Sequence, residues 1–181
     1  FSLYALIRLK ILTKPSLIIL TYHRIIPEHS PLRQYEQPGM IASPETLALH
    51  LRLFNHLGAE FIHLEDWLAL RDSGSPLPKM AIVVTFDDGW RDNHIYAFPV
   101  LQVYGLQALG VGPATSICFP KSDITSSGEQ IAAEFYRGSC TTRSGINQKD
   151  VSAYGLRRLN FHDGNGSSAL FFLGTVGRSL V

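Results

Sequence analysis

The stretch MAIVVTFDDG, residues 80–89, decides the fold class. Its apolar run, 80–86, predicts a buried strand, and Asp87 and Asp88 follow that strand side by side. Successive residues of a strand point to opposite sides, so the two carboxylates can diverge as the strand opens into its loop, and Gly89 relieves the turn. In α/β sheets, active sites lie beyond the carboxyl ends of the strands. The pair is therefore well placed for chemistry.

Two like charges this close repel each other unless a cation lies beside them, and a divalent metal is the natural partner. One aspartate would then ligate the ion while the other accepts a proton from metal-bound water. A plainer interpretation makes Asp-Asp-Gly a strand-to-helix turn, with one aspartate capping the next helix. The spacing alone favours this plainer interpretation, so the surrounding sequence has to decide.

Outward from this strand, short apolar strands alternate with helices. Ser43 is a good helix N-cap because Pro44 and an acidic residue follow it, and Gly58 ends the helix. The other predicted helices span 65–74, 97–105 and 126–136, and the predicted strands span 17–20, 61–64, 80–86, 116–119 and 139–142. Repeated strand, helix, strand units predict an α/β fold with a parallel sheet, either open or closed as a barrel.

The length of 181 residues suits one domain, 1–181, with a sizeable core. Hydrophobic residues make up 45% of the chain and charged residues 17%, which is ordinary for a globular protein. The formal net charge of +1 indicates no preference for nucleic acid. Cys118 and Cys140 are too few for a disulfide framework and lack CxxC spacing, so we expect them to be small core residues.

The sequence says less about location. No apolar run reaches the roughly 18 residues needed to span a bilayer. The N-terminal FSLYALIRLKIL lacks a small-residue cleavage site and is not expected to be a signal peptide. We therefore expect a soluble protein, cytoplasmic or exported if an upstream signal is missing, with its oligomeric state open.

TFDDG (85–89) at the end of an apolar strand, followed by AFPVLQVYG (97–105), resembles the first motif of the polysaccharide deacetylase family. This domain is also called the NodB-homology or chitooligosaccharide deacetylase domain. LTYHRI (20–25) and the block from PETLALHL to EDWLAL (44–70) are similar to family segments in the same order. The resemblance runs from about Leu17 to Gln107. It resumes at CFPKSD, at CTTRSGIN and at LRRL.

The resemblance implies a distorted (β/α) barrel that removes acetyl groups from N- or O-acetylated sugars. This is hydrolysis of a carbon–nitrogen, non-peptide bond when the group is N-acetyl, and it uses zinc or another divalent ion. By position in the motif, Asp87 would be the general base and Asp88 a metal ligand. His23, at the end of the first strand, is a further candidate ligand. The implied partner is an acetylated polysaccharide or oligosaccharide.

Four more residues have candidate roles near this motif. A backbone N–H near Phe119 and Pro120 could help to bind the oxyanion, although proline itself has no donor. Arg91 and Asp92 directly follow the motif and could orient Asp87, although capping or ion pairing would serve equally well for them.

The chain departs from the family at its histidines. The family completes its metal site with His-x-x-x-His, and none of the seven histidines here has that spacing. His50 and His56 are six apart and would face nearly opposite sides of one helix. Only twelve residues, 106–117, separate Gly105 from Cys118, whereas a strand, a helix and their connection need roughly 30.

We therefore expect an internal deletion near 106–117 that removes a βα segment with both histidines. The barrel would then be incomplete, with open sheet edges. A zinc site would be short of its usual three protein ligands, and the two aspartates would repel without compensation. Metal binding should be weak or absent.

The sequence leaves three possible functions to be compared. The first is a metal-dependent carbohydrate deacetylase. The second is a catalytically inactive or truncated family member that retains partial carbohydrate binding, with no cofactor. Trp67, Trp90 and Tyr96 could line its sugar groove, or could equally be core residues. The third is a phosphatase with an aspartate after a strand, which usually needs its two acids separated by one residue.

Overall fold

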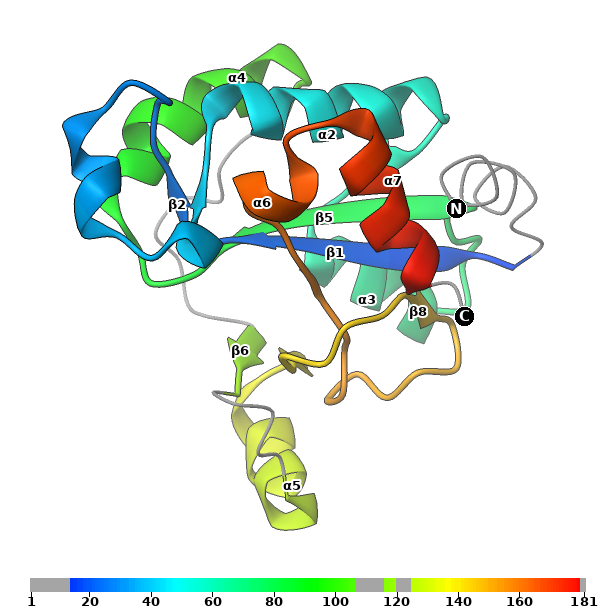
Figure 1. Ribbon diagram of the computed structural model, residues 1–181. Coiled ribbons are helices and arrows are strands. Elements are labelled where there is room, and N and C mark those ends of the chain that lie inside the picture. The colour runs from blue at the N-terminus through cyan, green and yellow to red at the C-terminus, as the bar shows by residue number, and fades with distance from the viewer. Residues whose placement is uncertain (1–13, 107–115, 120–124, 180–181) are drawn as a thin grey trace.

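The computed structural model describes residues 14–106, 116–119 and 125–179. Its centre is a pair of long parallel strands, β1 (Ser16–Tyr22) and β5 (Met80–Phe86), which lie side by side in Figure 1. They pair along their whole length, from Ser16 opposite Met80 to Tyr22 opposite Phe86. The strand predicted over 80–86 is confirmed at both ends.

The remaining strands are short. Beside β5 lies β4 (Glu60–Phe61), and β8 (Asn147–Gln148) and β9 (Leu159–Asn160) pair with β1. Two smaller pairs are β2 (Arg24–Ile25) with β3 (Ile41–Ala42), and β6 (Ser116–Cys118) with β7 (Gly138–Cys140). The prediction of a strand over 61–64 was too long, because the chain turns at His63 into a helix that begins at Leu64.

The described residues also form six α-helices and three other helical turns. They are η1 (Pro31–Tyr35), η2 (Pro38–Met40), α2 (Pro44–His56), α3 (Leu64–Asp72), η3 (Asn93–Ala97), α4 (Phe98–Val103), α5 (Ser126–Phe135), α6 (Asp163–Gly166) and α7 (Ala169–Arg178). The turns η1 and η2 are 3-10 helices, and η3 is a π-helical turn. None of the helices in the described residues is long and apolar enough to cross a membrane.

Alternate residues of β1 enter two separate cores. Ile18 and Leu20 pack with α2, α4 and α7 on one face of the sheet, where α2 and α4 lie in Figure 1. Leu17 and Ile19 pack on the other face against α3 and its fully buried Trp67. A strand buried on both faces reads as a continuous apolar run, which is why LIIL was recognisable from sequence.

The start of α2 is tied to the chain's C-terminal segment. The Ser43 hydroxyl accepts a hydrogen bond from the Thr46 N–H at 3.0 Å, which confirms the predicted N-cap. Asp163 accepts hydrogen bonds from the Ser43 N–H and the Thr46 hydroxyl and pairs with Arg33. Burial opposes the charge on Asp163, but these partners outweigh it and hold its pKa below the usual value. Asp163 therefore has a structural role, as does His162, which caps α6.

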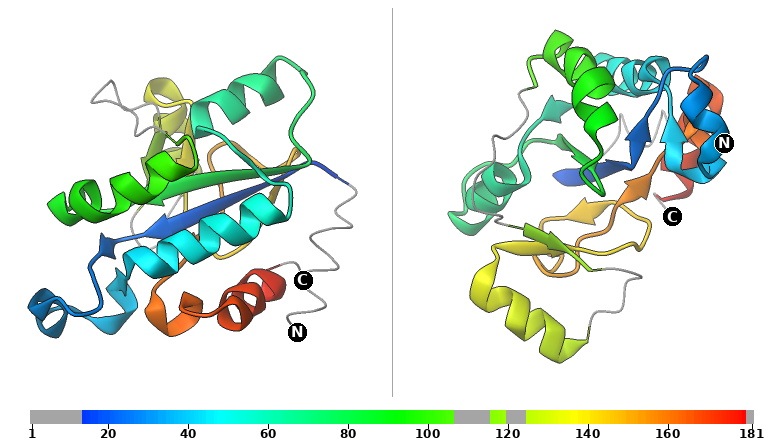
Figure 2. Two further views of the ribbon diagram at one scale, coloured as in Figure 1. Left: turned by 90° about the horizontal axis from the view of Figure 1, so that it is seen from above. Right: turned by 90° about the vertical axis from the view of Figure 1, so that its left-hand side faces the viewer.

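The sheet does not close. Thr141 and Ser139 join β7 to Leu156 by backbone hydrogen bonds, and the chain then runs from Leu156 into β9 beside β1. Within the described residues the main sheet has the order β4, β5, β1, β8, with β9 also paired to β1. There β6 pairs with β7, and no pairing connects β6 back to β4. Figure 2 shows β6, β7 and α5 as a separate lobe beside the main sheet. The expected α/β fold with an incomplete barrel is confirmed.

Two expectations stay predictions. Residues 107–115, which make up most of the expected deletion near 106–117, lie outside the described residues. The single domain over 1–181 has no independent test.

Candidate functional site

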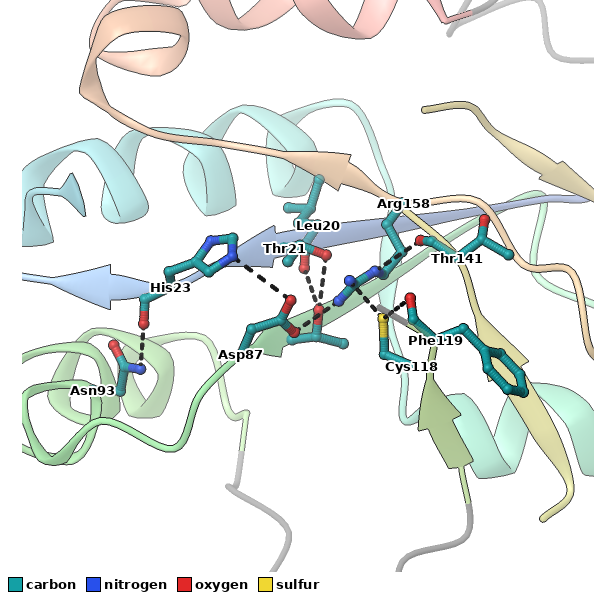
Figure 3. Close-up of polar contacts among 10 residues, drawn as sticks. Leu20, Thr21, His23, Asp87, Asn93, Cys118, Phe119, Thr141 and Arg158 are labelled. Carbon is teal, nitrogen blue, oxygen red and sulfur yellow. Dashed lines mark hydrogen bonds and ion pairs between the residues drawn. The ribbon is translucent and has the colours of Figure 1, made fainter. Parts of the chain in front are cut away.

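Asp87 stands at the carboxyl end of β5, with its backbone still in the sheet. Its N–H donates to the carbonyl oxygen of Tyr22 at 2.9 Å, which continues the ladder between β1 and β5. One carboxylate oxygen, Oδ1, lies 2.7 Å from Nη1 of Arg158, and Oδ2 lies 3.9 Å from Nε2 of His23 (Figure 3). The carboxylate is therefore held between an arginine and a histidine, and its side chain is 24% exposed.

Arg158 is the residue beside Asp87 that the sequence did not lead us to expect. Its side chain is 8% exposed and makes three contacts: with Asp87, with the Thr141 carbonyl at 3.1 Å and with the Cys118 sulfur at 2.7 Å. Burial opposes its charge, but the hydrogen bond and charge of Asp87 outweigh burial and raise the pKa of Arg158. The expected uncompensated repulsion at Asp87 is thus wrong, because this buried cation faces the carboxylate.

His23 does lie at the same site, as expected. It follows β1 directly, and its Nδ1 is buried and forms no hydrogen bond within the described part of the chain. Asn93 fixes the backbone on either side of it. The Asn93 amide donates to the His23 carbonyl at 2.8 Å and accepts from the Ile25 N–H at 3.1 Å. Sequence reasoning did not single out Asn93.

Asp88 lies at the surface of the protein. It is exposed, and its backbone is left-handed, with φ of 65°, followed by Gly89 at 63°. Aspartate tolerates this region better than most residues, but it still carries strain, of the kind that often occurs at functional sites. The Asp87 side chain is thus mostly covered, at 24% exposed, whereas Asp88 is exposed, and their divergence along the pleat stays a prediction.

The residues beside the motif serve other contacts. Asp92 is buried and pairs with Arg24, both of whose contacting nitrogens lie 2.7 Å from Oδ2, whereas Arg91 is exposed. The arginine that orients Asp87 is Arg158. The N–H of Phe119 donates to the Cys140 carbonyl at 3.0 Å, so it is not free to bind an oxyanion.

The remaining expectations around Phe119 concern Pro120 and the cysteines. Pro120 lies outside the described residues. Cys140 is buried, and burial raises its pKa to about 12. Cys118 is half-buried, and burial raises its pKa despite the opposing charge of Arg158. Cys140 is the expected core residue, whereas Cys118 contacts the site.

A cavity of about 600 Å³ opens beside these residues. It extends from the residues that follow β4, across β5, to β6, and so lies where the sheet fails to close. Asp87, Arg158 and Cys118 line it, together with His63 and His94. The volume is in the range of a small-molecule or sugar-unit site.

The donors present do not fit a zinc ion. All seven histidines and both cysteines lie in the described residues, as do all the acidic residues except Asp123. Within that described part of the chain, no three of these side chains are grouped to hold a metal ion. Asp87 already faces the Arg158 guanidinium, and a zinc site usually needs three protein ligands. The expectation of weak zinc binding stays a prediction.

The chain resembles known proteins in its fold. No protein-family model matches the chain, and no curated protein matches it. Solved structures do match. The deacetylase PplD of Streptococcus pyogenes, in complex with acetate, has a TM-score of 0.73 at 19% identity, covering 91% of this chain and 99% of that chain.

Two further structures agree. IcaB from Ammonifex degensii has a TM-score of 0.66 at 16% identity, covering 88% of this chain and 97% of that chain. A polysaccharide deacetylase from Bacillus cereus has a TM-score of 0.66 at 15% identity, covering 90% of this chain and 69% of that chain. At these identities the likeness concerns the fold. The chain has a polysaccharide deacetylase-like fold, a distorted α/β barrel that the described residues leave open between β4 and β6.

Proposed function

We propose that this chain is a member of the polysaccharide deacetylase family and that it recognises acetylated polysaccharides or oligosaccharides beside Asp87. One observation carries the proposal: a carboxylate at the carboxyl end of a central strand, which is held between Arg158 and His23 and lines a cavity of about 600 Å³. The neighbouring structures share the fold, and the one from Streptococcus pyogenes is a complex with acetate.

The family reaction is hydrolysis of N-acetyl groups on sugar polymers. In this chain Asp87 is the candidate base, which would take a proton from the water that attacks the acetyl carbonyl. Arg158 neutralises the charge of Asp87 and fixes the direction of its carboxylate. His23 lies on the other side of that carboxylate and restricts its movement. Asp87 needs no metal ion to be positioned.

The described residues offer little to stabilise the oxyanion that forms when water attacks the acetyl carbonyl. A bound metal ion supplies several kcal/mol of charge stabilisation in such reactions, and the described donors do not form a three-ligand set for one. The Phe119 N–H is engaged as well. Losing about 4 kcal/mol of stabilisation lowers a rate roughly 10³-fold. We therefore propose that sugar binding persists while hydrolysis is slow, which is the alternative of a catalytically weak family member.

Calorimetric titration and acetate release together test the proposed function. The probes are N-acetylglucosamine tetramers with β-1,4 and β-1,6 linkages, each with and without added zinc. We expect saturable binding of at least one tetramer, and acetate release that is slow and unchanged by zinc. Asp87→Asn should remove the residual acetate release, and Asp66→Asn, a carboxylate on α3, should not.

The outcomes separate the alternatives. Failure of both tetramers to bind the wild-type chain would contradict the proposed function. Rapid acetate release that depends on zinc would instead identify an active metal-dependent deacetylase, and would show that the donors near Asp87 rearrange to hold the ion.

A further inference from the structure

We propose that Trp90 is a stacking platform for one pyranose ring of the acetylated sugar polymer. The proposal rests on the proposed function and adds to it a binding subsite beside Asp87. Three features support it: the exposure of this ring, the contacts that hold it and its place next to the candidate base.

Trp90 emerges directly from the turn that carries the two aspartates. It lies three positions after Asp87, and such a segment spans at most about 10 Å. Its side chain is 42% exposed, whereas the chain's other tryptophan, Trp67, is fully buried against the sheet. Of the aromatic residues considered for a sugar groove, Tyr96 packs against the main core. Trp90 is the one that is available to a ligand.

The ring of Trp90 is fixed in place. The guanidinium carbon of Arg24 lies 4.2 Å from the ring centroid, a cation–π contact. Arg24 is itself anchored by Asp92 and Glu36 and is only 12% exposed. A platform whose position is already determined loses little conformational entropy when a ligand binds.

Contacts of neighbouring residues link Trp90 to Asp87. His23 faces Asp87, and the next residue, Arg24, holds Trp90. Asn93, which closes this loop, bonds to the backbone of His23 and Ile25, as the left side of Figure 3 shows for His23. The indole and the carboxylate therefore keep a constant relation, as two adjoining subsites of one chain-like ligand require.

The chemistry around Trp90 suits a sugar better than an apolar partner. A pyranose presents C–H groups on its faces, which stack on the electron-rich face of an aromatic ring, and hydroxyl groups at its edges, which need polar partners. Arg24, which stacks on Trp90, pairs with Asp92 and Glu36, and Tyr35, next to Glu36 in the sequence, is 79% exposed. An apolar helix docking here would have to cover the partly exposed Glu36 carboxylate and the Tyr35 hydroxyl, whereas a neutral N-acetylated hexose can form hydrogen bonds with both.

Intrinsic fluorescence gives a direct test, because the sequence contains two tryptophans and one of them is fully buried. Titration with the N-acetylglucosamine tetramers should shift the Trp90 emission and protect it from acrylamide quenching. By calorimetry, Trp90→Ala should weaken the Kd roughly tenfold. Trp90→Phe, which keeps an aromatic face, should retain most of the affinity. Phe135→Ala is the matched control, since Phe135 is 71% exposed on α5.

Unfolding curves of each variant establish that it is folded before binding is measured. Equal calorimetric affinity of the wild-type chain and Trp90→Ala, with no change in emission, would overturn the platform and leave the proposed function standing. No calorimetric binding to the wild-type chain would overturn the proposed function itself, and the platform with it.

Discussion

Replacing Arg158 with methionine should lower the free energy of unfolding by about 3 kcal/mol. Methionine keeps the apolar volume but leaves three groups without their partner: the Asp87 carboxylate, the Thr141 carbonyl and the Cys118 sulfur. The carboxylate is 24% exposed, so water offsets part of the loss, and the figure stays at the lower end for broken buried pairs. Urea unfolding at neutral pH measures it.

The neighbouring arginine provides the control. Arg157 is exposed, and Arg157→Met should change stability by no more than about 0.5 kcal/mol. Adding Asp87→Asn to Arg158→Met should recover part of the loss, because the uncompensated charge is then gone. Equal stabilities of the Arg158→Met and Arg157→Met proteins would show that Arg158 does not neutralise Asp87.

Acid should destabilise the fold by about 3 kcal/mol between pH 6.5 and 4, through His50. This side chain is fully buried on α2 and stacks on Phe172, with ring centroids 4.0 Å apart. Its Nε2 lies 2.8 Å from the Gly166 carbonyl and must donate, so Nδ1 accepts from the Tyr22 hydroxyl at 2.6 Å. Both ring nitrogens are satisfied in the neutral form.

Burial lowers the pKa of His50 to about 4, against the smaller opposing effects of the Gly166 hydrogen bond and the Asp163 charge. Below its ordinary pKa of about 6.5 the unfolded chain binds a proton that the folded chain does not. The His50 contribution to stability is therefore fully present above pH 6.5 and is lost as the pH falls toward 4. Burial also lowers the pKa of His162, which adds loss in the same direction.

Substitution separates the two histidines of α2. His50→Phe keeps the stack on Phe172 but leaves the Tyr22 hydroxyl and the Gly166 carbonyl without their hydrogen-bond partner. We therefore expect the free energy of unfolding to fall by about 2 kcal/mol at pH 7. In exchange, the slope of stability against pH should flatten, leaving the share of His162 and, near pH 4, that of Asp163. His56→Phe should leave both unchanged, since His56 is exposed. An undiminished slope in His50→Phe would assign the acid sensitivity elsewhere.

Local signals predicted much of the fold. The run 80–86 and the Ser43 N-cap were legible because a doubly buried strand and a capped helix each carry their pattern within a few residues. The helix α7 was missed, because Gly174 and Gly177 interrupt its apolar sequence and a glycine-rich loop precedes it. Tertiary packing there outweighs the low helix propensity of glycine, as both glycines are buried.

The site was half predictable. Asp87 and His23 follow apolar strands, and parallel strands bring their carboxyl ends together, so their proximity could be expected. Arg158 lies 71 positions from Asp87 and reaches it only because β9 pairs with β1. Its sole local signal was the pair of arginines in LRRL, and only the sheet shows which of them points inward. The cation beside Asp87 was therefore beyond sequence reasoning, whereas the shortage of histidines was not.

We propose that Arg158, and not a metal ion, neutralises Asp87 in this chain. Equilibrium dialysis of the wild-type chain against zinc tests it most directly, with Asp88→Asn and His23→Ala as comparisons. We predict weak zinc binding, well below one zinc ion per chain at micromolar zinc, and no difference among the three proteins. Tight binding of one zinc ion per chain that both substitutions abolish would contradict it.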